Sequence, residues 1–117
     1  MNDKDKLIPE SIQKILIEQH SESLNNPGVF MEKIHKPHLK LIGGLDFTCL
    51  ISEYDQERDM LYGLFDLGRG YELCRCSLTN LIKKEFHIHG IGHRKIERDK
   101  CFKPKKTLWE YYVELDI

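Results

Sequence analysis

Two pairs of residues with metal-binding side chains lie in the second half of the chain. Cys74 and Cys76 are two residues apart, and so are His87 and His89 in the stretch FHIHGIGH. Residues two apart on a β-strand point to the same face, so each pair could direct both members at one ion. Two thiolates and two imidazoles can form a tetrahedral zinc site. The spacing is therefore compatible with a structural zinc site, although it differs from that of common zinc fingers and ribbons.

A second interpretation of the same residues needs no metal. In a reducing compartment cysteines are mostly thiols, and unpaired ones behave as small buried hydrophobes. Histidines in a basic loop commonly face water. We prefer this interpretation, in which FHIHGIGH is an exposed polar loop and no cofactor is expected.

The histidine stretch lies in the most basic part of the chain. Residues 83–106 carry a net charge of +6 and the remainder carries −7, which together give the total of −1. A basic block on an acidic body can attract phosphates or an acidic partner. The residues expected to contact nucleic-acid phosphates are Lys83, Lys84, Arg94, Lys95, Arg98, Lys103, Lys105 and Lys106. The alternative is a solvated charged surface without a partner.

Sequence patterns predict an α+β fold in which an antiparallel β-meander is flanked by three helices. Residues 8–24 have helical spacing with Pro9 in the first turn, and residues 29–35 are expected to form a short strand. Residues 45–76 alternate as an antiparallel meander with a glycine-rich turn at 66–70. A short helix at 77–84 is capped by Ser77, residues 94–102 are extended, and residues 107–115 form the C-terminal helix.

Length and composition favour one domain over residues 1–117. A chain of this length can bury one core, and its composition, 40% hydrophobic and 32% charged, is ordinary for a globular protein. It has no apolar run of the length that spans a membrane. The charged N-terminus lacks the apolar segment of a signal peptide, so we expect a cytoplasmic protein with no membrane partner.

Two motifs resemble those of a known family. YGLFDLGRGYEL followed by SLTNL, and later IERDKCFKP, are similar to motifs of DUF2958, a family of small bacterial proteins of unknown function. The resemblance covers most of the chain and implies a cytoplasmic bacterial protein of a kind often encoded on plasmids and other mobile elements. It implies no established reaction. The family positions matching the cysteine and histidine pairs lack these ligands, so any zinc here would be structural.

The polar residues of these motifs raise the question of catalysis. They are Asp66, Glu72, Glu97, Arg98 and Asp99. Glu97 and Asp99 would share one face of a strand and could bind Mg²⁺ or divide acid and base roles. No common nuclease, esterase or nucleotide-binding motif accompanies them. We therefore prefer a structural role in which Arg98 pairs with Asp66 or Glu72 and holds the glycine turn.

The sequence as a whole favours binding over catalysis. We predict a non-catalytic accessory protein with a basic edge that faces nucleic acid. The alternative is a protein–protein adaptor or homodimer that uses Trp109, Tyr111 and Tyr112 of the C-terminal helix, because aromatic residues are common interface anchors. A metal-dependent hydrolase or nuclease is the third alternative.

Overall fold

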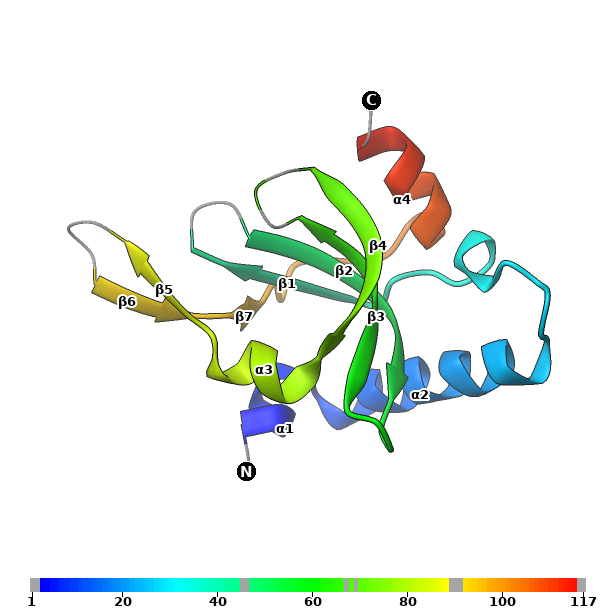
Figure 1. The fold of residues 1–117 in the computed structure, drawn as a ribbon, viewed down its shortest axis with the longest axis horizontal. Coiled ribbons are helices and arrows are strands. Elements are labelled where there is room, and N and C mark those ends of the chain that lie inside the picture. Colours follow the sequence, from blue (N-terminus) through cyan, green and yellow to red (C-terminus); the bar gives the residue numbers. More distant parts are fainter. Residues whose placement is uncertain (1–2, 45–46, 67, 69, 89–91, 116–117) are drawn as a thin grey trace.

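A five-stranded antiparallel sheet forms the centre of the protein (Figure 1). This computed structural model describes residues 3–44, 47–66, 68, 70–88 and 92–115, with the backbone alone at 85–88 and 92–93. The strand order is β4-β3-β2-β1-β7, and a separate two-stranded hairpin is formed by β5 and β6. The strands are β1 (Leu39–Gly43), β2 (Phe47–Asp55), β3 (Met60–Asp66), β4 (Tyr71–Ser77), β5 (Glu85–Ile88), β6 (Gly92–Lys95) and β7 (Glu97–Arg98).

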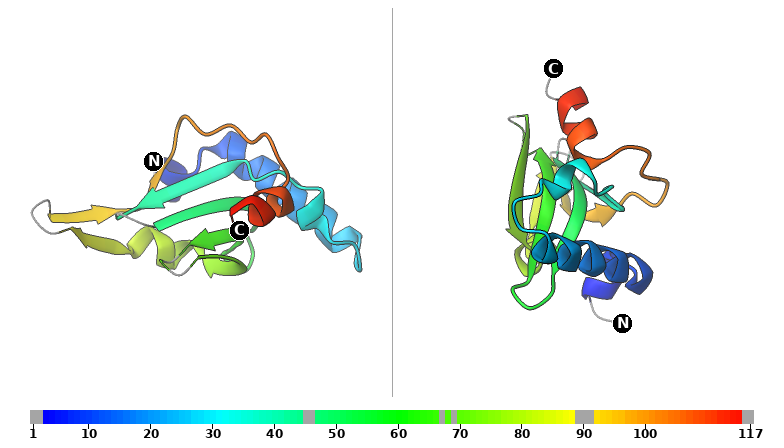
Figure 2. Two further views of the ribbon diagram at one scale, coloured as in Figure 1. Left: turned by 90° about the horizontal axis from the view of Figure 1, so that it is seen from above. Right: turned by 90° about the vertical axis from the view of Figure 1, so that its right-hand side faces the viewer.

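Helices cover both faces of this sheet. They are α1 (Asp3–Leu7), α2 (Glu10–Asn25), α3 (Leu78–Lys83) and α4 (Leu108–Leu115), with one 3₁₀ turn, η1 (Met31–Lys33). Figure 2 shows α2 on one side of the sheet and the β5–β6 hairpin projecting beyond it at one end. The described part of the chain has no helix long and apolar enough to cross a membrane. Helices packed on an antiparallel sheet confirm the predicted α+β class.

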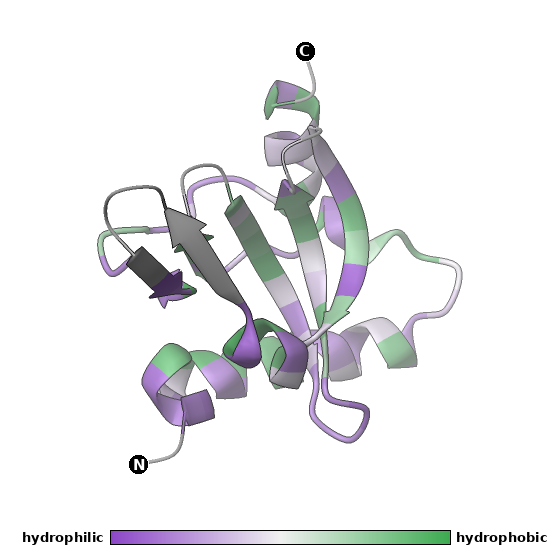
Figure 3. Ribbon diagram, turned by 60° about the vertical axis from the view of Figure 1, so that its left-hand side comes forward, coloured by the Kyte–Doolittle hydropathy of each residue, from purple (hydrophilic) through white to green (hydrophobic). Residues whose placement is uncertain are grey.

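The larger core lies between one face of the sheet and helices α1, α2 and α3. Leu16 of α2 packs there with Cys49, Ile51 and Phe65 of the central strands. The central strands are predominantly hydrophobic and the β2–β3 turn is hydrophilic (Figure 3). The alternation predicted for β2 holds for Phe47, Cys49 and Ile51, which all belong to this core, whereas Leu45 lies outside the described residues.

A smaller core on the opposite face explains why β2 is not polar there. Leu108 of α4 is fully buried against Leu50 and Leu64. The predicted capping box forms, since the Thr107 amide donates to Glu110 Oε1 at 2.9 Å and the Glu110 amide donates to Thr107 Oγ1 at 3.2 Å. Both satisfy amide groups that have no partner within the helix. The strand is thus buried on both faces.

A β-bulge interrupts the pairing of β2 with β3. The register shifts between Ile51 and Glu53, after which Glu53 faces Tyr62. Gly63 is paired with Ile51 at this point, and a Cβ atom there would lie 2.1 Å from the carbonyl oxygen of Leu50. Gly63 is therefore needed at the bulge for the close approach of the two backbones. Gly68 and Gly70 do have positive φ, at 92° and 103°.

Segment 29–35 was predicted as a strand and is not one. Its amides form turns instead, with the Lys33 amide donating to the Phe30 carbonyl and the Ile34 amide to that of Met31. These short-range bonds use the amides that a strand would offer to a neighbouring strand. The Ser77 cap is confirmed, because its Oγ accepts from the Asn80 amide at 3.2 Å. Helix α1 and the β5–β6 hairpin were not predicted.

Candidate functional sites

Three surface hollows surround the base of the β5–β6 hairpin. The first, of about 410 Å³, lies between α1, α3 and β7, and two more flank α3 and β6. Together they are lined by two carboxylates, Asp3 and Glu97, and by eight cationic residues. The cationic residues are Lys6, Arg75, Lys83, Lys84, Arg94, Lys95, Arg98 and Lys100. The base of the hairpin is therefore strongly basic.

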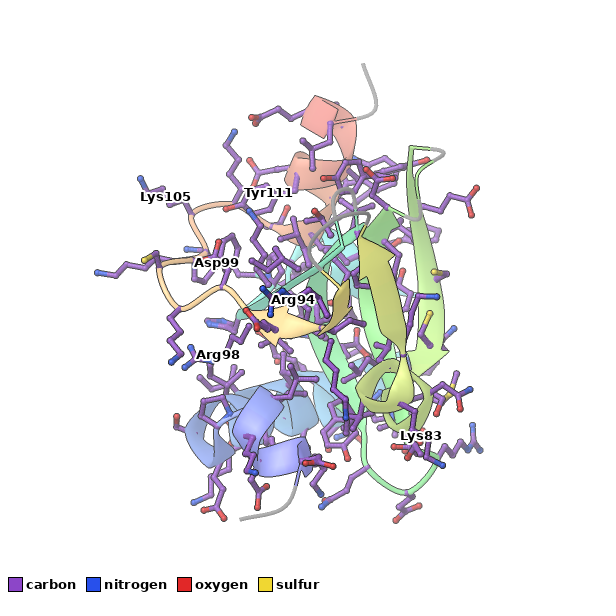
Figure 4. The ribbon with its side chains drawn as sticks, turned by 90° about the vertical axis from the view of Figure 1, so that its left-hand side faces the viewer. Lys83, Arg94, Arg98, Asp99, Lys105 and Tyr111 are labelled. Atoms are coloured by element: carbon purple, nitrogen blue, oxygen red, sulfur yellow. The ribbon has the colours of Figure 1, made fainter. Side chains whose placement is uncertain are left out.

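Elements far apart in the sequence build this region. Helix α1 supplies Lys6, and packing of α1 on α3 brings it near the residues of β6 and β7. Figure 4 shows Arg94 and Arg98 in the middle of this end of the molecule and Lys83 toward α3. Arg75 also stacks 5.0 Å from the Tyr62 ring centroid. We call the other seven cationic residues the hairpin-base surface.

Five of the predicted phosphate contacts lie on this surface, which also includes two cations that the sequence did not single out, Lys6 and Lys100. Lys6 precedes the basic segment by more than seventy positions, and only the packing of α1 places it there. The ring of Phe102, at the end of the basic segment, lies 6.2 Å from that of Tyr111 between centroids and belongs to the smaller core. It is therefore not available as an open stacking surface.

Three of the predicted phosphate contacts lie elsewhere, in the loop before α4. Lys106 forms an ion pair with Glu114 and lies 5.9 Å from the Tyr111 ring centroid. The Lys105 amide donates to Tyr111 Oη at 3.1 Å. Figure 4 shows Lys105 close to α4 and away from Lys83. Lys103, Lys105 and Lys106 line none of the three hollows around the hairpin.

The predicted pairing of Arg98 with Asp66 or Glu72 is wrong. Arg98 lies on β7 at one edge of the sheet, whereas Asp66 and Glu72 lie on β3 and β4 at the other. Three strand spacings of roughly 4.8 Å separate β7 from β3, which is beyond the reach of an ion pair. Asp66 instead accepts the Gly68 amide at 2.8 Å and stabilises the glycine turn itself.

The two carboxylates of the IERD motif have different environments. Asp99 Oδ2 lies 3.7 Å from Lys40 Nζ, and its other oxygen accepts the Cys101 amide at 3.0 Å. Glu97 is exposed and lines two of the hollows at the hairpin base. Among the described residues no group of three or more His, Cys, Asp or Glu side chains is arranged to hold a metal ion.

Cys74 and Cys76 share one face of β4, as their spacing predicts. Both pack against the larger core. Burial and the neighbouring Cys76 raise the pKa of the Cys74 thiol to about 11, and burial also raises that of Cys76. The side chains of His87 and His89 lie outside the described residues. A zinc site formed with them stays a prediction.

A chain of five titratable residues lies at the opposite end of α2 from α1. Its order is Glu22, His35, Glu53, His20, Asp55, so carboxylates and imidazoles alternate. His35 lies 3.5 Å from both Glu22 Oε2 and Glu53 Oε2, and His20 lies 3.2 Å from Glu53 Oε1 and 3.5 Å from Asp55 Oδ2. We call these five residues the carboxylate–imidazole chain.

The centre of this chain is buried. His35 is 3% exposed and Glu53 is 6% exposed, and Ser23 Oγ donates to Glu53 Oε2 at 2.8 Å. Neither ring nitrogen of His35 makes a geometrically complete hydrogen bond, although each faces a carboxylate. Buried polar groups are usually fully hydrogen-bonded, so His35 is an exception that needs a physical reason.

The carboxylate–imidazole chain lies just beyond the bulge in β2, where the pairing of β2 with β1 has ended. The pairing of β1 with β2 ends at Leu39 and Ile51. The backbone of β2 after Ile51 therefore needs other hydrogen-bond partners on that side. Gln19 Nε2 donates to the Ser52 carbonyl at 2.5 Å and to the Lys36 carbonyl at 3.1 Å. These bonds join α2, β2 and the segment after η1. Sequence reasoning missed the chain because no local spacing links residues from three separate elements.

Comparison with known proteins gives one finding. The family model described as "Protein of unknown function (DUF2958)" matches residues 7–115, nearly the whole chain. Neither the curated proteins nor the solved structures contain a significant match.

Proposed function

Since the chain belongs to the DUF2958 family, whose function is unknown, we propose a function from its own surface: a non-catalytic cytoplasmic protein that binds nucleic acid at the hairpin-base surface. The observation that carries this proposal is the concentration of cationic side chains around three adjoining hollows, where eight cationic residues meet two carboxylates. Lysine and arginine at such density neutralise phosphates and release their counterions.

The exposure of these side chains supports the same proposal. Lys83, Arg94, Lys95 and Lys100 are exposed and Arg98 is half-buried. Each can reach a phosphate without first breaking an ion pair among the described residues. In contrast, Lys106 is already paired with Glu114. The hairpin base therefore offers more of its positive charge to a ligand than the loop before α4 does.

The acidic remainder of the chain determines from which side a polyanion approaches the protein. It carries −7 against the +6 of residues 83–106, so a polyanion is repelled elsewhere and approaches through the hairpin end. Such a surface also fits the link with plasmids and mobile elements that the family resemblance implies. Because phosphate contacts carry no sequence information, we expect binding to depend weakly on base sequence.

A charge-reversal experiment tests this function. Binding of fluorescent single-stranded DNA, duplex DNA and RNA is measured by anisotropy over a series of salt concentrations. We expect the double variant Lys95→Glu, Arg98→Glu to lose at least about tenfold in affinity and to reduce the slope of log K against log salt by about two. The variant Lys14→Glu, at an exposed position of α2, is the matched control. Equal affinity of the two variants, or no binding by the wild type, would reject the proposal.

A second function, binding of a protein partner or of another copy, rests on different residues. The rings of Trp109 and Tyr112 in α4 lie 5.5 Å apart between centroids, and both are partly buried. Among the described residues the large exposed apolar side chains are Leu24, Val29, Phe30, Ile34, Ile42, Val113 and Leu115. Light scattering of the wild type and Phe30→Ser tests self-association. If the wild type is a monomer and binds no other protein, this function has no support.

A further inference from the structure

We propose that the carboxylate–imidazole chain is a proton-operated clamp. When both imidazoles are protonated, the chain holds residues 31–38 and the start of α4 against α2 and β2, and it loosens as the pH rises. The clamp is independent of the nucleic-acid surface, which lies at the other end of the molecule.

The placement of each imidazole between two carboxylates is the first argument. His35 faces Glu22 and Glu53, each at 3.5 Å. A neutral imidazole has one N–H group and can donate to only one of two acceptors, whereas the protonated ring donates from both nitrogens. Protonation of His35 would therefore give each of its ring nitrogens an N–H group that faces a carboxylate. His20, between Glu53 and Asp55, has the same arrangement.

Charge balance is the second argument. With neutral imidazoles, the chain would bring three carboxylates together, the central one buried. A buried carboxylate is costly unless it is paired with a positive charge and hydrogen-bonded. The hydroxyl of Ser23 supplies one donor to Glu53. Protonation of His20 and His35 would supply two positive charges and the missing donors.

Other charged groups near the chain do not replace these protons. Arg58 Nε lies 3.9 Å from Asp55, at a highly exposed position where the pair is weak. Tyr62 of β3 is paired with Glu53 and is neutral at this pH, and Glu32 of η1 acts on Tyr62 without adding positive charge. The Arg75 guanidinium also acts on Tyr62, but it stacks on that ring and no ion pair joins it to Glu53 among the described residues. Lys36 and His38 follow His35 in the same segment, and Lys36 acts on His38. The imidazoles are thus the groups placed to compensate Glu53.

The backbone of His35 determines what the clamp holds. Its amide donates to the Met31 carbonyl at 2.7 Å, and its carbonyl accepts the Leu108 amide at 2.9 Å. The first bond closes the turn of η1, and the second fixes the first residue of α4. Lys33 also lies 5.0 Å from the Trp109 ring centroid. Release of His35 would therefore loosen η1 and α4 together.

The sign of the pH dependence follows from linkage. If the folded chain holds more protons than the unfolded chain, stability falls as the pH rises. Unfolded histidine titrates near pH ~6.5, so the clamp is complete below that value and is progressively lost above it. For each proton concerned, the unfolding equilibrium constant rises by up to about tenfold per pH unit.

The experiment combines NMR titration of the imidazole Cε1–H signals with urea unfolding from acidic to mildly alkaline pH. We expect His20 and His35 in the folded chain to stay protonated to a higher pH than histidines of the urea-unfolded chain. The unfolding constant of the wild type should rise with pH, and that of His35→Gln should rise much less. His38→Gln, three positions away, is the control: burial lowers the pKa of His38, so removing this imidazole should leave the rise with pH intact or make it steeper, and should not reduce it.

Two outcomes would overturn the clamp. In the first, the His20 and His35 signals of the folded wild type titrate at or below the pH at which histidines of the unfolded chain titrate. This outcome is measured on the wild type alone, so it does not depend on whether His35→Gln folds. The other is that His35→Gln and the wild type have the same dependence of unfolding on pH.

Discussion

The hairpin-base surface and the carboxylate–imidazole chain lie at opposite ends of the molecule and use their charges in opposite ways. At the hairpin base, cations of like sign gather at the surface around hollows. In the chain, acids and bases alternate around a buried carboxylate. Exposed charges are solvated and cost little to leave unpaired, whereas buried ones must be compensated. The first region is therefore suited to an external ligand, and the second constrains the fold.

The largest loss of stability is predicted for a substitution in the buried carboxylate–imidazole chain. Glu53→Gln keeps the shape of the side chain and removes the charge between His20 and His35, so we expect the free energy of unfolding to fall by about 3 kcal/mol. Urea denaturation in mildly acidic buffer measures this change. Glu57→Gln, at an exposed position of the β2–β3 turn, is the control and should stay within about 0.5 kcal/mol of the wild type. Equal stability of the two variants would show that Glu53 is not part of a buried charge network.

A smaller loss of stability is expected when the partly exposed cap of α4 is removed. Thr107→Ala removes the hydroxyl that accepts the Glu110 amide, and loss of such a cap costs about 1 kcal/mol. Ser21→Ala, at an exposed position inside α2, lacks this function and should be close to neutral. Urea denaturation of both variants sharpens the comparison. If Thr107→Ala is also neutral, α4 is held by its packing on Leu50 and Leu64 alone.

The third prediction concerns a histidine outside the chain. Burial, with a contribution from Lys36, lowers the pKa of His38. The folded chain therefore disfavours protonated His38, which subtracts stability as the pH falls below about 6.5 and has no effect well above it. We expect His38→Gln to gain stability relative to the wild type at acidic pH only, as measured by thermal melting. This sign is opposite to that proposed for His35, and a gain that persists at alkaline pH would contradict it.

The smallest effect is expected from charges that belong to neither region. Lys103→Glu combined with Lys105→Glu changes two exposed side chains, so the free energy of unfolding should change by less than about 0.5 kcal/mol. Affinity for nucleic acid should fall much less than in the double variant of Lys95 and Arg98. Anisotropy and urea denaturation measure the two quantities. Equal losses of affinity would extend the binding surface along the loop to α4, as the sequence alone predicted.

Signals contained in short stretches of sequence were reliable. The Ser77 cap, the capping box of Thr107 and Glu110, and the glycine turn of the β3–β4 hairpin are all present. The FDLG and IERD motifs identified the family correctly. Each of these signals depends on residues a few positions apart, whose backbone geometry is determined by their own hydrogen bonds and allowed angles.

Predictions that required knowledge of neighbours in space failed or were not made. Arg98 was assigned to Asp66 or Glu72, but insertion of β1 and β2 between these strands separates them. Segment 29–35 was predicted to be a strand, but it forms turns held by its own backbone hydrogen bonds. His35 was given no role because Glu53 and His20 come from other elements.

By itself, the sequence determined the fold class, the family, the helix caps and the excess of positive charge in residues 83–106. Only the tertiary structure decided which charges face water and which face each other. The physical reason is that the energy of a charge depends on its burial and on partners within a few ångströms. Strand order, the bulge at Ser52 and Glu53, and the packing of α1 on α3 set those distances, and none of them is encoded by local spacing.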